Sequence, residues 1–335
     1  MFATRLFSNI LTPRNISSVR LLQVCVLGGA SEIGQAVSLM LRTEPAVSKL
    51  VIHDTWETAP GVVIELSHIP AKATLKGYLG DATMTQALSG SDLVLLVGGL
   101  LKTPGVSDRS CVEANTEFVK TASSQIARLP KMPFVGVVAE PINSLVPMAA
   151  ELMRNNGMFD GKKLFGVTEI DRIRVQTLYG ARHGMAPEEC FVPVIGGHSD
   201  KTTVPLVSQA RPGFEMSEPE VRQFVNEVQR YESTVTEAKQ GRSPTVSVAY
   251  GVLQFARSAL RALQGQECWL HAFIENNDFG TSFFSGLVRV DASGAQEMAR
   301  YTDNISQYEC QILEDALNHL RRDVAVGKKV LEVET

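Results

Sequence analysis

The sequence predicts an α/β fold whose first half is a doubly wound parallel sheet, and three observations support this. Apolar runs of strand length recur through that half, as in LLQVCVLGG at 21–29 and LVLLVGG at 93–99. Stretches with helical spacing lie between such runs, as in EIGQAVSLMLRT at 32–43. Glycines or acids stand where the runs end. The carboxyl ends of parallel strands therefore form one edge of the sheet, and ligands bind such sheets at that edge.

The same pattern continues in order along the first half. KLVIHD at 49–54 and FVGVVAE at 134–140 are expected to be strands. PGVVIELSHI at 60–69 opens with a proline, which is typical of a first helical turn. VEANTEFVKTASSQIARL at 112–129 has the spacing of a longer helix.

The pattern changes after about residue 167. PVIGGHSDKTTVPLVSQA at 193–210 predicts short strands with a tight glycine turn. Long helices are expected at 217–239 and 244–264, strands at 269–276 and 282–290, and a closing helix at 303–326. We therefore expect an α+β domain at 168–335, packed without a flexible linker against the doubly wound domain at 21–167.

Composition excludes several classes of function. The 335 residues carry a net charge of −4, so no basic excess indicates nucleic-acid binding. No apolar run reaches the roughly 20 residues that a membrane span needs. The five cysteines are scattered, which favours reduced thiols over a disulfide or metal framework. We expect no bound metal.

Residues 1–20 differ from the rest of the chain. They hold three arginines and five serines or threonines but no acid. Phe2, Leu6 and Ile10 share one helical face until Pro13 interrupts the pattern. This combination is typical of a mitochondrial import segment, so we expect the protein in the mitochondrial matrix. A disordered basic tail is the alternative interpretation.

A candidate acid–base centre lies in the second half. His198 follows two glycines at a predicted strand turn, where its imidazole can face a cleft. Asp171 and Arg174 are three residues apart and share a face if FGVTEIDRIRV ends as a helix. An aspartate against imidazole raises the pKa of the ring, and an arginine can bind a carboxylate through two hydrogen bonds. Reduction of a 2-oxo acid requires such a set. A lone histidine is also compatible with a structural role.

The chain resembles mitochondrial-type malate dehydrogenases from about residue 22 to its C-terminus. PGVVIELSHI, KGYLG, FGVTEID, PVIGGHSDKT and VSVAY match blocks of that family in order. The resemblance implies a Rossmann domain and a catalytic domain, NAD as hydride carrier, malate and oxaloacetate as substrates, and a homodimer. It implies that His198 transfers the proton, that Asp171 supports the imidazole of His198, and that Arg174 binds the substrate carboxylate.

The resemblance also implies a set of binding residues. Asp54, at the end of KLVIHD, takes the place of the acid that accepts the adenosine ribose hydroxyls and favours NAD over NADP. Gly28, Gly34 and Asn115 fall at further cofactor-binding positions, and Asn143 falls at a substrate-binding position.

The first departure from the family pattern lies in the phosphate loop. Where the family has three glycines spaced three apart, this chain has Gly28, Ser31 and Gly34. Ser31 adds a side chain where the backbone should approach the pyrophosphate. Glu32 stands at the start of the helix whose N–H groups should face that anion. Glu32 either caps this helix or competes with the cofactor.

Further departures lie around the substrate. Lys102 and Asp108 stand where the family has two arginines that bind the dicarboxylate, and Arg109 would face the substrate only if the loop shifted by one residue. Glu140 replaces an asparagine that hydrogen-bonds the substrate, and Glu169 replaces a neutral residue.

Three hypotheses follow from these acids. The chain is a homologue with little or no turnover that serves as a structural or interaction subunit, alone as a homodimer or within a larger mitochondrial assembly. Alternatively, it is a working NAD-dependent malate or 2-hydroxy-acid dehydrogenase with Lys102, Arg109 and Arg174 as its cations. A third hypothesis is an enzyme for a substrate with a neutral or cationic second arm, selected by Asp108.

Overall fold

The computed structural model describes residues 20–101, 106–301, 303 and 305–329. The strands are β1 (Leu22–Leu27), β2 (Val47–Asp54), β3 (Thr74–Leu79), β4 (Leu93–Leu96), β5 (Phe134–Val137), β6 (Leu164–Val167), β7 (Val194–Gly196), β8 (Thr203–Pro205), β9 (Cys268–Glu275), β10 (Phe283–Asp291) and β11 (Gly294–Met298). The helices are α1 (Glu32–Arg42), α2 (Ala59–Ser67), α3 (Met84–Leu88), α4 (Asp108–Ile126), α5 (Ile142–Asn155), α6 (Glu169–His183), α7 (Glu218–Gln229), α8 (Tyr231–Ala238), α9 (Val246–Leu263) and α10 (Gln307–Lys329). The predicted α/β fold is confirmed.

All the strands of the described part belong to one sheet, in the order β3-β2-β1-β4-β5-β6-β9-β10-β7-β8, with β11 paired to β10. Strands β1 to β6 are parallel, and β9 pairs with β6 in the antiparallel sense. The chain runs outward from β1 to β3 and then returns to place β4 beside β1. This reversal is the switch point at which doubly wound sheets bind ligands.

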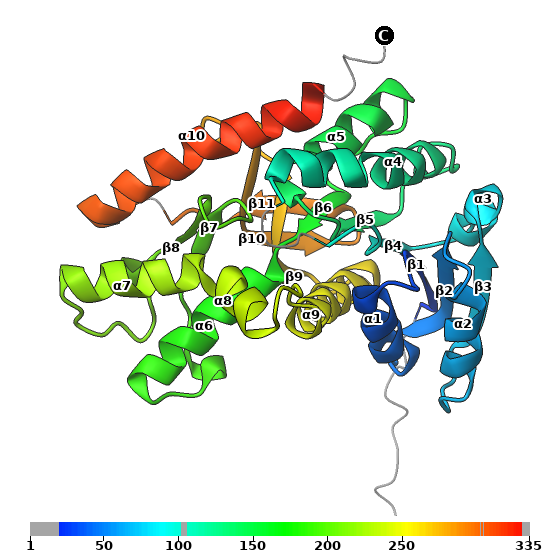
Figure 1. Cartoon of the computed structure of the whole chain (residues 1–335), viewed down its shortest axis with the longest axis horizontal. Coiled ribbons are helices and arrows are strands. Elements are labelled where there is room, and N and C mark those ends of the chain that lie inside the picture. Colours follow the sequence, from blue (N-terminus) through cyan, green and yellow to red (C-terminus); the bar gives the residue numbers. More distant parts are fainter. Residues whose placement is uncertain (1–19, 102–105, 302, 304, 330–335) are drawn as a thin grey trace, which may run out of the picture.

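Helices cover both faces of the sheet (Figure 1). Helices α4, α5 and α10 pack together on one face, and α1 and α9 pack together on the other. Strand β1 shows why both faces bury apolar residues. Val24 and Val26 belong to the core beneath α1 and α9, whereas Cys25 and Leu27 belong to the core beneath α4 and α5. Successive side chains of a strand point to opposite faces, so a continuous apolar run fills both cores.

Some expected elements differ from the structure. The helix expected at 217–239 is interrupted at Arg230, whose φ of −90° and ψ of 0° separate α7 from α8. The closing helix begins later and ends later than expected, at Gln307–Lys329. Strands β3, β6 and β11 were not expected, because none of them lies in a long apolar run.

Two expectations concern membranes and import. None of the helices in the described ranges is long and apolar enough to cross a bilayer. The proposed import segment lies outside the described residues except for Arg20, which pairs with Asp92.

Candidate active site

The imidazole of His198 lies in the turn between β7 and β8, against the first turn of α6. Its Nδ1 is 2.5 Å from Oδ2 of Asp171. Asp171 is buried, and only 9% of the His198 side chain is exposed. The predicted pair is therefore brought together, although 27 residues separate its members. An aspartate at Nδ1 fixes the ring orientation and directs Nε2 outward as the acid–base atom.

Glu140 occupies the space in front of that second nitrogen. Its Oε1 is 2.9 Å from Nε2 of His198, and its Oε2 accepts the N–H of Ile142 at 3.2 Å. Glu140 lies between β5 and α5, so its carboxylate is also held at the positive end of a helix. The carbonyl oxygen of a 2-oxo acid would need the same Nε2 proton. Glu140 therefore competes with substrate for the proton donor.

The two carboxylates change the protonation of the ring. Burial is the largest single influence and lowers the pKa of His198, but the charges and hydrogen bonds of Asp171 and Glu140 together raise it well above the ordinary 6.5. Burial raises the pKa of Asp171, but the charge and hydrogen bond of His198 outweigh it, so this pKa is lowered from 3.8. The protonated form of the His198 imidazole is therefore favoured, with the side chains of Asp171 and Glu140 at its two nitrogens.

Arg174 lies one turn beyond Asp171 on α6. Its Nη1 is 3.6 Å from Oδ1 of Asp171, and its guanidinium lies 5.0 Å from the ring centroid of Tyr231 on α8. The side chain is only 10% exposed, and its Nε has no hydrogen-bond partner among the described residues. A buried guanidinium with unused donor capacity is suited to a carboxylate guest.

Two small cavities adjoin His198 in the described part of the chain. Each has a volume of about 20 Å³, which is about the space of one water molecule. Arg174, His198 and Glu232 line both of them, and Glu140 lines one. The sequence prediction missed Glu232, which lies on α8. Glu232 lies within a helix that the sequence predicts, but no sequence motif marks it as a site residue.

Two asparagines expected to bind ligands form hydrogen bonds to the backbone of the site. Asn143 is buried; its Oδ1 accepts the N–H of His198 at 2.8 Å, and its Nδ2 donates to Thr202 and Asp323. Asn115 is also buried and donates to the carbonyl oxygen of Glu140 at 2.6 Å. They position the residues on both sides of the proton donor. Their ligand contacts stay predictions.

The phosphate loop is closely packed at its glycines. A Cβ at Gly28 would lie 2.1 Å from Cα of Gly98, and one at Gly34 would lie 2.2 Å from the carbonyl oxygen of Gly28. Ser31 is the N-cap of α1: its Oγ accepts the N–H of Gly34 at 2.9 Å and donates to Val97 at 3.0 Å. Glu32 is exposed on the first turn. Of the two interpretations of Glu32, that it caps this helix is wrong, because Ser31 caps it; that it competes with the cofactor stays a prediction.

A cavity of about 260 Å³ lies at the switch point, between the ends of β1, β2 and β4. This is close to the lower end, roughly 300 Å³, of typical ligand pockets. Asp54 lines it and accepts N–H groups from Ala30, Thr55 and Trp56. A carboxylate has about four acceptor positions and three are used, so one ribose hydroxyl could still bind Asp54. The cavity thus fits the adenosine end of a dinucleotide, with the pyrophosphate toward the start of α1.

Of the residues on the loop expected to bind the second carboxylate, the structure describes the side chain of Arg109. Lys102 lies outside the described residues, as does the side chain of Asp108, whose backbone begins α4. Arg109 points to solvent and pairs with Glu113 at 3.0 Å. The loop shift that would bring Arg109 to the substrate stays a prediction. Glu169 is buried and binds Arg172 and the N–H of His271, so it is structural.

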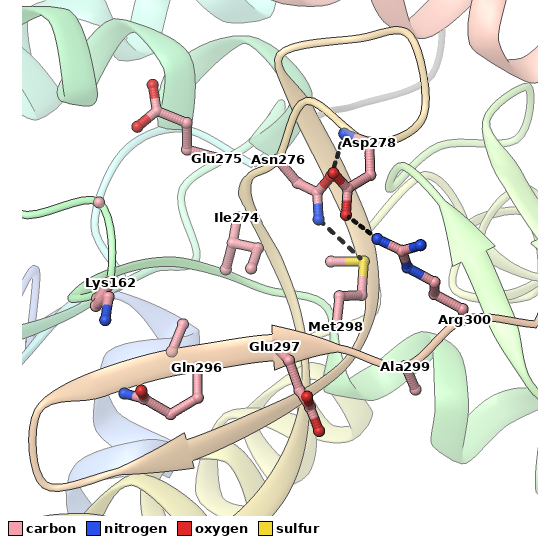
Figure 2. A pocket seen from close by; sticks show the side chains of 12 residues that line it. Lys162, Ile274, Glu275, Asn276, Asp278, Gln296, Glu297, Met298, Ala299 and Arg300 are labelled. Carbon is pink, nitrogen blue, oxygen red and sulfur yellow. Dashed lines mark hydrogen bonds and ion pairs between the residues drawn. The ribbon is translucent and has the colours of Figure 1, made fainter.

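A larger cavity than those at His198 lies elsewhere. It is a groove of about 760 Å³ beside β11 and the turn after β9 (Figure 2). Its charged side chains include Arg300, which binds Asp278 at 3.1 Å, and Glu297, which binds Arg289. None of its lining residues lines the cavities at His198.

Comparison with known proteins assigns the class. The chain matches the NAD binding domain of lactate/malate dehydrogenases over residues 22–166 and their α/β C-terminal domain over residues 168–331. The chain therefore belongs to the lactate/malate dehydrogenase family of oxidoreductases, whose cofactor is NAD.

Its relatives within the family narrow the assignment to the malate dehydrogenase type. A malate dehydrogenase of Vibrio vulnificus is 37% identical over 308 residues, which cover 91% of this chain and 98% of the relative. A malate dehydrogenase of Idiomarina loihiensis has the same identity and coverage. Both relatives are bacterial.

Solved structures share the fold at lower sequence identity. The malate dehydrogenase of Cryptosporidium parvum superposes with a TM-score of 0.79 at 18% identity, and covers 92% of this chain and 99% of that one. A lactate dehydrogenase of the same organism, solved with lactic acid and nicotinamide adenine dinucleotide, gives 0.77 at 16% identity, covering 92% of this chain and 98% of that one.

Proposed function

We propose that the protein is an NAD-dependent oxidoreductase that interconverts malate and oxaloacetate or a related pair of 2-hydroxy and 2-oxo acids. The observation that carries this proposal is the buried pair of His198 and Asp171, 2.5 Å apart, with Arg174 beside it. NAD, when bound, would carry the hydride. The chain would supply the proton from Nε2 of His198 and bind the substrate carboxylate through Arg174. The malate dehydrogenases at 37% identity support the same activity.

A second candidate function is a relative with little turnover and a structural or interaction role. The contact between Glu140 and Nε2 of His198 favours it, because the contact removes the proton donor from substrate. Freeing the donor means breaking a charge-assisted hydrogen bond of about 1.5–3 kcal/mol. The comparisons favour the active enzyme more directly than this alternative.

Two assays on the full-length protein separate the candidates. NADH binding is followed by its fluorescence, and oxaloacetate reduction is followed by NADH consumption, with His198→Ala as the background control. Turnover in the ordinary range of about 1–1000 s⁻¹ would establish the dehydrogenase. NADH binding with turnover no faster than the control would support the second candidate. If the protein neither binds NADH nor reduces oxaloacetate, the dehydrogenase proposal is refuted.

We also propose a homodimer. Ile64 on α2 and Val246 and Tyr250 on α9 are large apolar side chains that are 61%, 78% and 48% exposed. A partner surface that covers them would remove this apolar area from water. Light scattering coupled to size exclusion should give twice the chain mass, and Val246→Asp should give the monomer. A monomeric parent protein would refute the proposal.

A mitochondrial location is proposed on the basis of residues 1–20, which carry three arginines and no acid. The bacterial relatives give no support for it. Import of the full chain into isolated mitochondria, compared with a chain that lacks residues 1–20, tests the location. Equal uptake of both chains would contradict it. Pull-down from a matrix extract would then test membership of a larger assembly.

A further inference from the structure

The turn after β2 places a tryptophan beside the cavity at the switch point. Trp56 is 51% exposed, and it lines this cavity together with Asp54. Its N–H donates to Oδ1 of Asp54 at 3.1 Å, and its carbonyl oxygen accepts the N–H of Ala59 at 3.0 Å, where α2 begins. The backbone of Trp56 is therefore held by the same carboxylate that is expected to bind the adenosine ribose.

Further apolar side chains line the same cavity. Leu100, which follows β4, is exposed, and Phe118 on α4 is half-buried. Trp56 and Leu100 follow strands that both pair with β1, so they approach the cavity from the two sides of that strand. A flat apolar guest in the cavity would remove their exposed area from water.

The charged side chains of this cavity favour an uncharged guest over an anion. Among its described lining residues, Asp54, Asp81 and Glu117 are acids, and His53 is the one basic side chain. Even a protonated His53 would leave the acids in excess. A phosphate group would therefore be repelled at this end of the site, whereas an uncharged base would not.

The imidazole of His53 gives independent evidence that the cavity receives a guest with hydrogen-bond donors. His53 is buried, and its Nε2 lies 3.1 Å from the carbonyl oxygen of Gly80. A carbonyl oxygen only accepts, so Nε2 carries a proton, and Nδ1 of the neutral ring is an acceptor. This Nδ1 is buried without a hydrogen-bond partner among the described residues. Adenosine has an amino group and hydroxyls, and a donor of either kind would satisfy this nitrogen.

We propose that Trp56 binds the adenine of the cofactor, with its indole stacked against the base. The turn after β2 then supplies both a carboxylate for the ribose and an aromatic face for the base. The inference rests on the NAD binding that is part of the proposed function, and it identifies the residue that determines the affinity for the adenosine end. Stacking uses the π-face of a base, so another aromatic side chain at position 56 should preserve it.

Tryptophan fluorescence tests this contact directly, because the chain has two tryptophans. The second, Trp269 on β9, is exposed and is not among the residues that line the cavity. The probe is ADP-ribose, which has the adenosine end of NAD without the nicotinamide. It should quench the emission of full-length Trp269→Leu, whose one tryptophan is Trp56, and leave the emission of Trp56→Leu unchanged. Quenching of Trp269→Leu by nicotinamide mononucleotide instead of ADP-ribose would overturn the inference.

Calorimetry then measures how much the indole contributes to affinity. Trp56→Leu should weaken the binding of ADP-ribose roughly 5- to 140-fold, as expected for the loss of one base–aromatic stack. Trp56→Phe keeps an aromatic face and should bind within about threefold of the parent protein. Trp269→Leu is the matched control and should bind as the parent does. Equal melting temperatures of parent and variants would show that all of them are folded. Parent-like affinity in Trp56→Leu would overturn the inference, as would equal weakening in Trp56→Phe.

These binding measurements keep the inference separate from the proposed function. If ADP-ribose binds through Trp56 but the protein does not reduce oxaloacetate, the inference stands and the dehydrogenase proposal fails. If the protein reduces oxaloacetate with NADH but the loss of Trp56 does not weaken ADP-ribose, the dehydrogenase stands and the inference fails. A parent protein that does not bind ADP-ribose would also refute the inference.

Discussion

Ser31 and Glu140 are two departures from the family pattern with opposite consequences. Ser31, in the turn after β1, replaces a glycine, and the fold accommodates it: its hydroxyl caps α1 and binds the end of β4. Glu140, after β5, replaces an asparagine, and its carboxylate lies 2.9 Å from the proton-donating nitrogen of His198.

The difference shows what decides the effect of a substitution near a binding site. The turn after β1 has a backbone N–H that needs a partner, so a short polar side chain satisfies the chain's own backbone. The end of β5 faces a buried imidazole, so a carboxylate there changes the charge of the reacting group. We therefore expect changes at Ser31 to alter stability slightly and changes at Glu140 to alter chemistry.

Asp171→Asn should have the largest effect. It tests whether the charges around His198 depend on one another. It leaves a buried imidazole and Arg174 without their shared carboxylate, at a cost of about 3–5 kcal/mol in the free energy of unfolding. Urea denaturation measures this. Asp200→Asn, at an exposed acid beside the same cavity, is the control. A loss no larger than that of the control would mean that Asp171 is not part of a coupled set.

Glu140→Asn should free Nε2 of His198 to donate its proton to substrate, which tests whether Glu140 alters the chemistry. Loss of a charge-assisted hydrogen bond of about 1.5–3 kcal/mol should raise kcat/KM for oxaloacetate by roughly 10- to 100-fold. Steady-state reduction assays at neutral pH measure the rise. Glu113→Gln on the exposed face of α4 should leave the rate unchanged. An unchanged rate in Glu140→Asn would show that this carboxylate does not limit the reaction.

Changes at Ser31 should have a smaller effect, on stability and not on the reaction. Ser31→Ala removes the helix cap and should lower the free energy of unfolding by about 1 kcal/mol, whereas Ser31→Gly should lower it by only a few tenths. Neither should change the affinity for NADH more than threefold. If Ser31→Gly tightens NADH binding tenfold, the claim that Ser31 affects only stability is wrong, because Ser31 would then obstruct the pyrophosphate.

Arg109→Ala should have the smallest effect. Arg109 and Glu113 form an exposed pair one helical turn apart, and such pairs contribute less than about 0.5 kcal/mol. Neither thermal stability nor oxaloacetate reduction should change measurably. A large loss of activity would mean that the loop does bring Arg109 to the substrate.

The sequence predicted the parts of the molecule that follow local rules. Apolar runs identified β1, β2, β4 and β5, and a three-residue spacing placed Asp171 and Arg174 on one face of α6. The contact between Asp171 and His198 followed from the chemistry of the pair. The break at Arg230 and the place of Glu232 could not be predicted, because they depend on tertiary contacts of α8 such as that of Tyr231 with Arg174. The sequence placed Glu140 at a substrate-binding position, but its direct contact with Nε2 of His198 required the geometry of the fold.

The charge state of His198 also makes stability depend on pH. The pKa of His198 in the folded protein is raised well above its ordinary 6.5. Its contribution to stability is therefore complete below pH 6.5 and is lost as pH rises through the folded pKa. The pKa of Asp171 is lowered from 3.8, so its contribution holds above that pH and is lost as pH falls through the folded pKa.

Nuclear magnetic resonance of the histidine side chains, titrated with and without Glu140, tests the central claim most directly. The imidazole of His198 should remain protonated at pH values well above 6.5 in the parent protein, and its apparent pKa should fall in Glu140→Gln. An imidazole that titrates near 6.5 in both proteins would contradict the account, because Glu140 would then have no effect on the pKa of His198.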